Sequence, residues 1–308
     1  MNESSQMRHS RSLQDSRFGP LTTRFPLRRK TVSSVLRGIF HGLIAPWCSH
    51  RTFAVADYQV MVPARSLFAR QLAKYRGYEP VNSNWLISTV ECRPQDLYVD
   101  VGANFGWYSM LLARVAPRAS IVAIEPGHEN FTLLQRNIER NQFVNIVAIN
   151  RGAGAQPMQS TLFAHEQDNP GAHSIRQTSQ ATAGEVIRIE PLDRLLEAHP
   201  GRIGLLKIDV EGYEMDVLLG AKETLERTDQ ILLEYSPDFL SECGHHPLEL
   251  LDNLQRAGFH PHRVSATGLE PIARDRLVHR DPTLAQGHRW QVDLVFVRGG
   301  AGLTSVVR

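Results

Sequence analysis

The chain has 308 residues, of which 42% are hydrophobic and 21% charged, so it is long enough for one large domain with a well-buried core. Residues 1–51 carry nine Arg and Lys against two acidic residues, a charge of +7, so the net charge of +2 leaves −5 on the remainder. This acidic body predicts no nucleic-acid partner. The three cysteines lie far apart, and the sequence shows neither a secretory signal nor an apolar run of about 18 residues. We therefore expect no transmembrane segment and a cytoplasmic protein.

Residues 1–50 are predicted to form a basic, partly disordered leader with one amphipathic helix at about residues 31–45. Apolar residues recur there at helical spacing: Val32, Val35, Leu36, Ile39, Phe40, Leu43 and Ile44. Three cations, at 28–30, precede the helix. We favour an apolar stripe that packs on its own domain or on a second subunit, because such stripes usually mark a buried face. The alternative is peripheral contact of residues 28–45 with an anionic membrane.

Residues 51–308 are predicted to form a single domain, with a core at about 75–240 and C-terminal strands up to 298. Apolar runs predict strands at 58–62, 97–101, 120–124, 144–149, 186–189, 203–210, 230–235, 260–264 and 292–297, with a hairpin strand around residue 161. Helical spacing predicts helices at 64–75, 83–91, 107–115, 129–141, 192–197, 214–226 and 248–256. This alternation predicts an α/β fold whose mostly parallel sheet has helices on both faces. The last strand follows a loop without a crossover helix, so we expect it to be antiparallel, at the sheet edge.

The loop after the strand at 97–101 has the sequence Asp100-Val-Gly102-Ala-Asn104-Phe-Gly106 and leads directly into a helix. Ligands of open α/β sheets bind beyond the carboxyl ends of the strands, where glycines let the backbone approach them. A dinucleotide-binding loop has the pattern Gly-x-Gly-x-x-Gly, and here Asn104 replaces its middle glycine. The loop therefore argues against an NAD(P)-dependent oxidoreductase.

Glu125 stands at the tip of the next strand, 25 residues after Asp100. A carboxylate at this position suits the two ribose hydroxyls of a nucleoside. A helix cap or a solvated acid is the structural alternative, and the adjacent glycine loop favours the nucleoside.

Lys207, Asp209 and Glu211 alternate with apolar residues at the end of the strand at 203–210. In an extended chain they point to one side of the sheet. Charges at the end of a central strand are costly unless they pair or face a wet crevice. An ion pair that only stabilises the strand end is the structural alternative to a functional site.

Three segments together resemble the FkbM family of class I methyltransferases, over about residues 75–239. They are the sequence Val-Asp-Val-Gly-Ala-Asn-Phe-Gly-Trp-Tyr-Ser at 99–109, Glu125-Pro126, and Leu-Lys-Ile-Asp-Val-Glu-Gly-Tyr-Glu at 206–214. The resemblance implies a Rossmann-like sheet of seven strands with an antiparallel last strand. It also implies S-adenosylmethionine as cofactor, and O-methylation of a hydroxyl on a sugar, glycan or natural-product acceptor.

The resemblance further implies that Asp100, Gly102, Asn104 and Gly106 line the methionine end of the cofactor, and that Glu125 holds its ribose. The residues at 151–154 depart from the Ser-Asp pair that is usual after the third strand, which puts the contacts to adenine in doubt.

In-line methyl transfer to a hydroxyl requires an aligned acceptor oxygen and a positioned base. We expect Asp209 to lie nearest to cofactor and acceptor, and Glu211 to orient or deprotonate the hydroxyl. Lys207 either holds these carboxylates or, if desolvated, acts as the base. Glu234, at the tip of the strand at 230–235, and His173, in a loop, are the expected substrate contacts.

Three alternatives complete these expectations. Asp209, Glu234 and Asp193 offer oxygen ligands to a divalent metal, but their spacing does not require one, so a metal is possible and not favoured. The second alternative is a protein that binds S-adenosylmethionine without catalysis. The presence of acidic residues at 100, 125, 209 and 211 argues against it. An NAD(P)-dependent oxidoreductase is the least favoured, because of Asn104 and the lack of a Tyr-x-x-x-Lys pair.

Overall fold

A single large sheet organises the computed structural model, which describes residues 24–25, 32–92, 95–164, 173–174, 184–265, 268–285 and 290–299. The sheet has eight strands in the order β13-β12-β14-β11-β10-β3-β4-β5. The pairs among β11, β10, β3, β4 and β5 are all parallel. The predicted α/β fold with a mostly parallel sheet is therefore confirmed, with one strand more than the seven expected.

The strands of this sheet lie close to the predicted ranges. They are β3 (Leu97–Val101), β4 (Ser120–Ile124), β5 (Ile146–Ile149), β10 (Ile203–Ile208), β11 (Thr228–Tyr235), β12 (Phe259–Ser265), β13 (Gly268–Pro271) and β14 (Val292–Arg298).

The last strand, β14, is antiparallel as predicted, but its predicted place at the sheet edge is wrong. It pairs with β11 on one side and with β12 on the other. Five of its seven residues are buried, which is typical of a strand with neighbours on both sides. The edge is formed by β13, a short hairpin partner of β12 that supplies the eighth strand.

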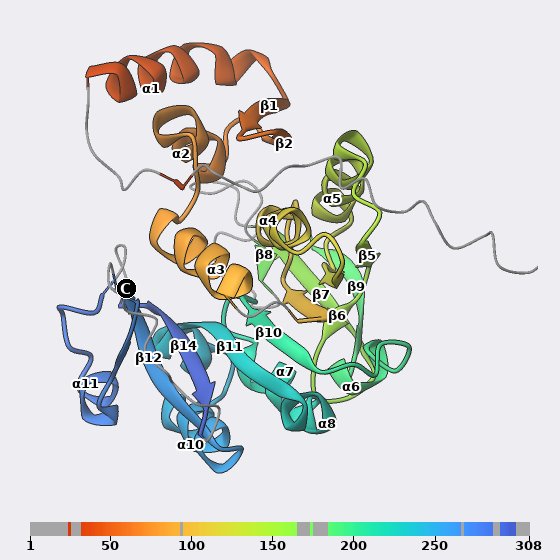
Figure 1. Ribbon diagram of the computed structural model, residues 1–308, viewed down its shortest axis with the longest axis vertical. Helices are drawn as coiled ribbons and strands as arrows, with labels where there is room; N and C mark the ends of the chain where they lie inside the picture. The colour runs from red at the N-terminus through yellow and green to blue at the C-terminus, as the bar shows by residue number, and fades with distance from the viewer. Residues whose placement is uncertain are drawn as a thin grey trace, which may run out of the picture.

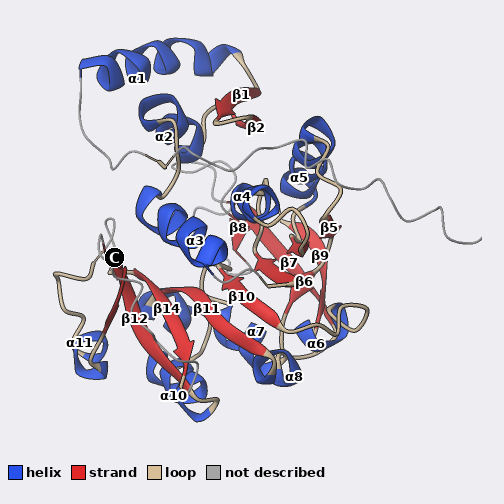
Figure 2. Ribbon diagram, viewed as in Figure 1, coloured by secondary structure: helices blue, strands red, loops and turns tan. Residues whose placement is uncertain are grey.

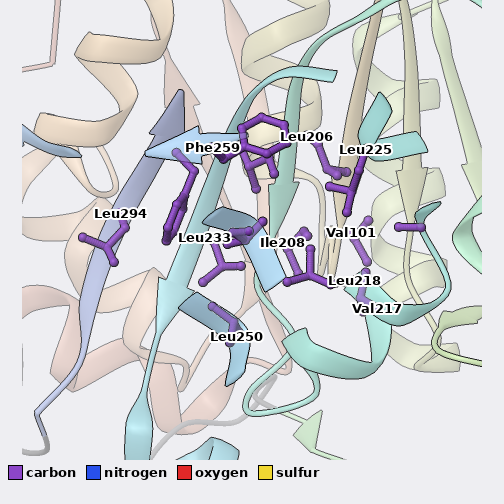
Figure 3. Packing of buried hydrophobic residues seen from close by; sticks show 14 of the residues in the cluster. Val101, Leu206, Ile208, Val217, Leu218, Leu225, Leu233, Leu250, Phe259 and Leu294 are labelled. Atoms are coloured by element: carbon purple, nitrogen blue, oxygen red, sulfur yellow. The ribbon is translucent and has the colours of Figure 1, made fainter. Parts of the chain in front are cut away.

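Helices cover both faces of the sheet (Figure 2). One face carries α3 (Pro80–Cys92), α4 (Trp107–Val115) and α5 (His128–Asn141). The other carries α6 (Leu192–Leu195), α7 (Glu214–Leu219), α8 (Lys222–Glu226), α9 (Pro237–Glu242) and α10 (Pro247–Arg256), with α11 (Arg274–Val278) beyond them. Side chains of alternate strand residues fill these two layers, and Figure 3 shows the second one, in which Val101, Ile208 and Leu233 meet α7 and α10.

The prediction of a single helix at 214–226 is wrong, because this segment forms two helices, α7 and α8, that are separated at Gly220. A Cβ atom at Gly220 would lie 2.0 Å from the carbonyl oxygen of Gly154. The backbone N–H of Asp193 also donates to the carbonyl oxygen of Gly220 at 3.0 Å. Backbone from two other segments thus occupies the space in which a continuous helix would place side chains.

A smaller four-stranded sheet lies beside the main one. Its order is β6-β9-β7-β8, with β6 (Gly152–Ala153), β7 (Met158–Ala164), β8 (His173–Ser174) and β9 (Glu185–Glu190). The antiparallel pair of β7 and β9 aligns Thr161 with Val186, so the strand predicted around residue 161 is present.

The N-terminal elements form a separate layer at one end of the molecule (Figure 1). They are α1 (Val32–Ile44), a short 3-10 turn (Ala45–Trp47), the hairpin of β1 (His50–Val55) and β2 (Tyr58–Pro63), and α2 (Leu67–Tyr75). Most of the leader that was predicted to be disordered lies outside the described residues. Phe25 is an exception, because its ring is buried 5.3 Å from that of Trp107.

The helix predicted at 31–45 is present as α1, but the prediction that its apolar stripe packs on the domain is wrong. Val35, Leu36, Ile39, Phe40 and Leu43 are between 48% and 68% exposed. The opposite, polar side of the helix packs against α2 instead. Along the described stretches of chain, none of the helices is long and apolar enough to cross a membrane.

Asn137 attaches the N-terminal hairpin to the main domain. Its side chain is fully buried, accepts a hydrogen bond from the Met61 N–H at 2.7 Å, and donates to the carbonyl oxygens of Met61 and Phe105, both at 2.9 Å. One turn later, the half-buried Asn141 makes the same two-way contact with the backbone of Gln59, at 2.8 and 2.7 Å.

We expect Asn137→Ala to lower the free energy of unfolding by about 2–4 kcal/mol, because it leaves buried backbone groups without partners. Asn141→Ala should cost less than about 1 kcal/mol, because water can replace the lost partner. Urea unfolding of the two variants measures the difference, and equal losses would contradict the role of burial.

Candidate active site

The loops that follow β3 and β10 touch each other through their backbones at the carboxyl edge of the sheet. Gly102 has a φ of +76°, and a Cβ atom there would lie 1.8 Å from the carbonyl oxygen of Asp209. The N–H of Asp209 donates to the carbonyl oxygen of Val101 at 3.1 Å. Only glycine allows this approach, so Gly102 determines how close the two loops lie.

The rest of the β3 loop depends on two further residues with positive φ. Asn104 has a φ of +53°, a conformation that asparagine tolerates, and its Oδ1 accepts a hydrogen bond from the Phe105 N–H at 3.0 Å. Gly106 has a φ of +93° at the start of α4, and a Cβ there would lie 2.5 Å from the Leu134 side chain. Asn104 therefore shapes this turn without a middle glycine.

Glu125 holds this loop to the loop after β4. Its carboxylate accepts hydrogen bonds from the N–H groups of Asn104, at 2.8 Å, and Gly127, at 2.9 Å. Burial raises the pKa of Glu125 to about 7, although these two N–H donors act in the opposite direction. The Asn130 side chain is a third hydrogen-bond partner of this carboxylate, which has about four acceptor positions.

Lys207 lies between two carboxylates beside the same loop. Lys207 and Asp100 are register partners on β10 and β3, and the Lys207 Nζ lies 3.7 Å from Asp100 Oδ1 and 3.1 Å from Asp209 Oδ2. Asp100 is 1% exposed, and its Oδ2 accepts a hydrogen bond from the Ser109 hydroxyl at 2.6 Å. The side chain of Asp209 is 42% exposed, so it is the member of this group that reaches solvent.

These neighbours keep Lys207 charged. Burial acts to lower the pKa of Lys207, but the negative charges of Asp209 and Asp100 outweigh it and hold the pKa above its ordinary value. The ammonium also lies 5.0 Å from the centre of the Tyr108 ring. Of the two predicted roles for Lys207, holding the carboxylates suits this environment and acting as a base does not.

Glu211 does not continue the extended chain, so its predicted alignment with Lys207 and Asp209 is wrong. Strand β10 ends at Ile208, and Glu211 has a φ of +54° in the turn that follows. This turn is held by Glu214, whose buried carboxylate accepts hydrogen bonds from the N–H groups of Gly212, at 3.0 Å, and Val210, at 3.3 Å. The alternation of charged and apolar residues could not reveal this turn.

A pair of carboxyl groups stands opposite each other on β11 and β14. Glu234 and Asp293 are register partners, both are half-buried, and they receive hydrogen bonds from Gln291 at 3.0 Å and Asn82 at 2.7 Å, respectively. Burial and the charges of Asp209 and Glu211 raise the pKa of Glu234 well above its usual range. Burial also raises the pKa of Asp293, to about 8, with contributions from the charges of Glu79 and Asp209.

Sequence reasoning assigned no role to Asp293 or Glu79. Glu79 is half-buried, has a φ of +40°, and accepts a hydrogen bond from the Tyr108 hydroxyl at 2.5 Å. An acidic residue inside the apolar strand at 292–297 is a signal that could have identified Asp293. Glu79 lies within the stretch that resembles the family, but its place at the site became clear from the effect of its charge on Lys207 and Asp293.

The remaining predicted residues do not join this group of side chains. Asp193 caps α8 by accepting hydrogen bonds from the N–H groups of Thr224, at 2.7 Å, and Glu223, at 3.1 Å. The backbone of His173 lies in β8, and its side chain is outside the described part of the structure. Within the described ranges, no three His, Cys, Asp or Glu side chains are arranged to hold a metal ion.

A cavity of about 290 Å³ lies between β12, β14 and the helices α10 and α11, and one of about 150 Å³ lies where β3, β10 and β11 begin. No predicted site residue lines either of them. The charged residues at the carboxyl edge therefore define the candidate site.

Comparison with known proteins places the chain in a family. The family described as "Methyltransferase FkbM domain" matches residues 100–261, which is 162 of the 308 residues. This range contains the loop after β3, Glu125, the segment around Lys207, and Glu234. Asp293 and Glu79 lie outside it.

Individual relatives are more distant. Methyltransferase 1 of Beauveria bassiana is 32% identical over 162 residues, which cover 46% of this chain and 65% of that protein. The 2-O-methyltransferase NoeI of Sinorhizobium fredii is 28% identical over 184 residues, which cover 55% of this chain and 74% of that protein. The crystal structure of methyltransferase FkbM from Methylobacillus flagellatus is 18% identical, with a TM-score of 0.39, and covers 66% of this chain and 43% of that one.

The chain thus spans less than two thirds of the Beauveria protein. The family match covers more than half of the chain and includes the segments from which the resemblance was predicted. The protein belongs to the FkbM methyltransferase family.

Proposed function

We propose that the protein is an S-adenosylmethionine-dependent methyltransferase that methylates a hydroxyl group of a sugar, glycan or natural-product acceptor. The observation that carries this proposal is the convergence of Glu125, the Gly102 loop and the pair of Lys207 and Asp209 at one edge of the sheet, in a chain of the FkbM family. The name of the Sinorhizobium relative, a 2-O-methyltransferase, supports an oxygen acceptor.

The residues at the tips of β3 and β4 fit this cofactor. Asp100 Oδ1 is buried and accepts no hydrogen bond from the described residues. Glu125 accepts hydrogen bonds from Asn104, Gly127 and Asn130, and a carboxylate has about four acceptor positions, so one remains for a ribose hydroxyl. We propose that Glu125 holds the ribose, and that Asp100, with the backbone of Gly102, Asn104 and Gly106, faces the methionine end.

Bound S-adenosylmethionine supplies a methyl group that its sulfonium already activates, so the protein has to orient the acceptor and accept a proton. We propose that Asp209 orients the acceptor hydroxyl, because it is exposed while Lys207 holds its carboxylate in place. The charged Lys207 also stabilises the negative charge that remains on Asp209.

The proton of the hydroxyl needs a base whose pKa is close to the operating pH. Burial raises the pKa of Asp293 to about 8, which meets this condition, and it raises the pKa of Glu234 above the usual range of a carboxyl group. We propose that this pair, together with Glu211 in the turn beside it, receives the proton. In this proposal Glu234 contacts the acceptor, as the sequence predicts.

A reducing compartment is the environment in which we propose that the enzyme works, and the cytoplasm is such a compartment. The three cysteines of the chain lie far apart in the sequence and form no paired spacing, which supports this proposal.

The cofactor assignment is tested by calorimetry with S-adenosylmethionine and with NAD. We expect only the first to bind. Glu125→Gln should weaken its binding by about 1.5–3 kcal/mol, or roughly 10- to 150-fold, through loss of charge-assisted hydrogen bonds. Because the pKa of Glu125 is about 7, affinity in the unmodified protein should rise from pH 6 to pH 8 and stay flat in the variant. Binding of NAD alone would contradict the assignment.

The catalytic proposal is tested by the release of S-adenosylhomocysteine in the presence of a library of sugar and polyketide hydroxyl acceptors. We expect Asp209→Asn to lower turnover by about 10²- to 10⁴-fold, while cofactor affinity changes by less than about threefold. The control is Asp96→Asn, which alters an exposed carboxylate before β3, away from the site. Cofactor binding without turnover of any acceptor would instead favour a protein that binds S-adenosylmethionine without catalysis.

The proposed carboxyl pair also predicts a dependence of stability on pH. The folded-state pKa of Asp293, about 8, lies above the ordinary value of 3.8, so its favourable contribution is present below about pH 4 and is lost as the pH rises to 8. Asp293→Asn should therefore gain stability relative to the unmodified protein between these pH values, by about 1–2 kcal/mol, and lose about 10²-fold in turnover.

Thermal unfolding at pH 5 and pH 8.5 measures this gain, with Asp96→Asn as the control that should show none. A stability difference that does not change with pH would exclude the titration of Asp293 in the folded protein.

A further inference from the structure

The exposed stripe of α1 is a second surface that methyl transfer does not use. It consists of Val35, Leu36, Ile39, Phe40 and Leu43, which are 48%, 60%, 56%, 61% and 68% exposed. They recur at helical spacing along one side of a helix that forms the outermost element at its end of the molecule (Figure 1). A contiguous apolar patch of this kind usually marks an interaction site.

Polar contacts on the opposite side of α1 attach the helix to α2, so that the stripe faces solvent. Arg37 donates hydrogen bonds to the carbonyl oxygens of Ala73, at 3.1 Å, and Lys74, at 2.7 Å, in the last turn of α2. His41 is 3% exposed, and its Nδ1 lies 2.5 Å from a guanidinium nitrogen of Arg51. The cation of Arg37 is also favourably placed at the negative end of the α2 dipole. The orientation of α1 is therefore built into the fold.

The stretch of sequence that contains the stripe carries charge of one sign. Residues 16–56 contain seven Arg and Lys and no Asp or Glu, and three of these cations, Arg28, Arg29 and Lys30, directly precede α1. Two copies of the chain that met through this stripe would bring these positive segments together, which opposes self-association. An anionic surface would instead be attracted to them.

Trp47 follows the stripe in the chain, beyond the end of the helix. It is 87% exposed and lies in the 3-10 turn that follows α1. Tryptophan prefers the boundary between lipid headgroups and acyl chains, where its ring is apolar on one side and polar on the other.

We propose that α1 and Trp47 form a docking surface for the anionic face of a lipid membrane. The stripe enters the headgroup region with the helix parallel to the membrane plane, and the positive charge of the surrounding sequence attracts the anionic lipids. This proposal does not depend on the methyltransferase activity, and binding can be measured without an acceptor.

The test is co-sedimentation of the full chain with vesicles of phosphatidylcholine containing about 30% phosphatidylglycerol, and with vesicles of phosphatidylcholine alone. We expect binding to the first that is lost at about 0.5 M salt, and at least about tenfold weaker binding to the second. The variant Leu36→Gln/Phe40→Gln/Leu43→Gln should bind the anionic vesicles at least about tenfold more weakly. Its residues are exposed, so its melting temperature should not fall.

The matched control is Val144→Gln/Val186→Gln, which removes two exposed apolar side chains, 98% and 68% exposed, that lie outside α1. This variant should bind vesicles as the unmodified protein does. Quenching by brominated lipid should fall sharply in Trp47→Phe, because Trp47 is 87% exposed, whereas Trp85 and Trp107 are 8% and 2% exposed and Trp290 is half-buried.

Failure to bind anionic vesicles, or undiminished binding by the triple variant, would overturn the proposal. A dimer of the unmodified protein that the triple variant converts to monomer, without vesicle binding, would assign the stripe to a second copy of the chain. Capture of an acidic protein through the stripe, again without vesicle binding, would assign it to a protein partner.

Discussion

The backbone contact between Gly102 and Asp209 is the constraint on which the site depends. Because no side chain stands at 102, the loops after β3 and β10 meet, and the Asp209 N–H continues the strand pairing by donating to Val101. Asp100 and Lys207 are register partners on β3 and β10, just before these loops, and this contact holds them side by side. Any Cβ at 102 would push the ends of β3 and β10 apart. The residues proposed to hold the cofactor would then lie farther from those proposed to hold the acceptor.

Lys207 compensates a marked excess of negative charge at this edge of the sheet. Its ammonium lies within 4 Å of two carboxylates, and burial raises the pKa values of Glu125, Glu214, Glu234 and Asp293. Buried acids with raised pKa values lower the free energy of unfolding as the pH rises. Apolar side chains at the same positions would not cause this loss of stability. Such groups are suited to exchange protons near neutral pH, which is what hydroxyl methylation requires.

The helix α1 shows how one sequence pattern permits opposite structures. Its period of apolar residues predicts an amphipathic helix, and the helix is present, but the buried side is the polar one. The energetic reason lies in α2, whose last carbonyl groups accept hydrogen bonds from Arg37 and so favour its guanidinium over an apolar side chain. The period by itself contains no information about what the neighbouring helix offers.

The sequence by itself determined the alternation of strands and helices, the ranges of β3, α4 and β4, the glycine loop with Asn104, and the acid at 125, because these depend on local periodicity, turn chemistry and residue type. Tertiary structure decided the insertion of β14 between β11 and β12, the turn that carries Glu211 away from the strand, and the meeting of Glu234 with Asp293. These depend on which distant backbones come into contact: Glu214 closes the turn after β10, and pairing with β11 brings residue 293 opposite residue 234. Such contacts arise between segments far apart in the chain, and no local pattern encodes them.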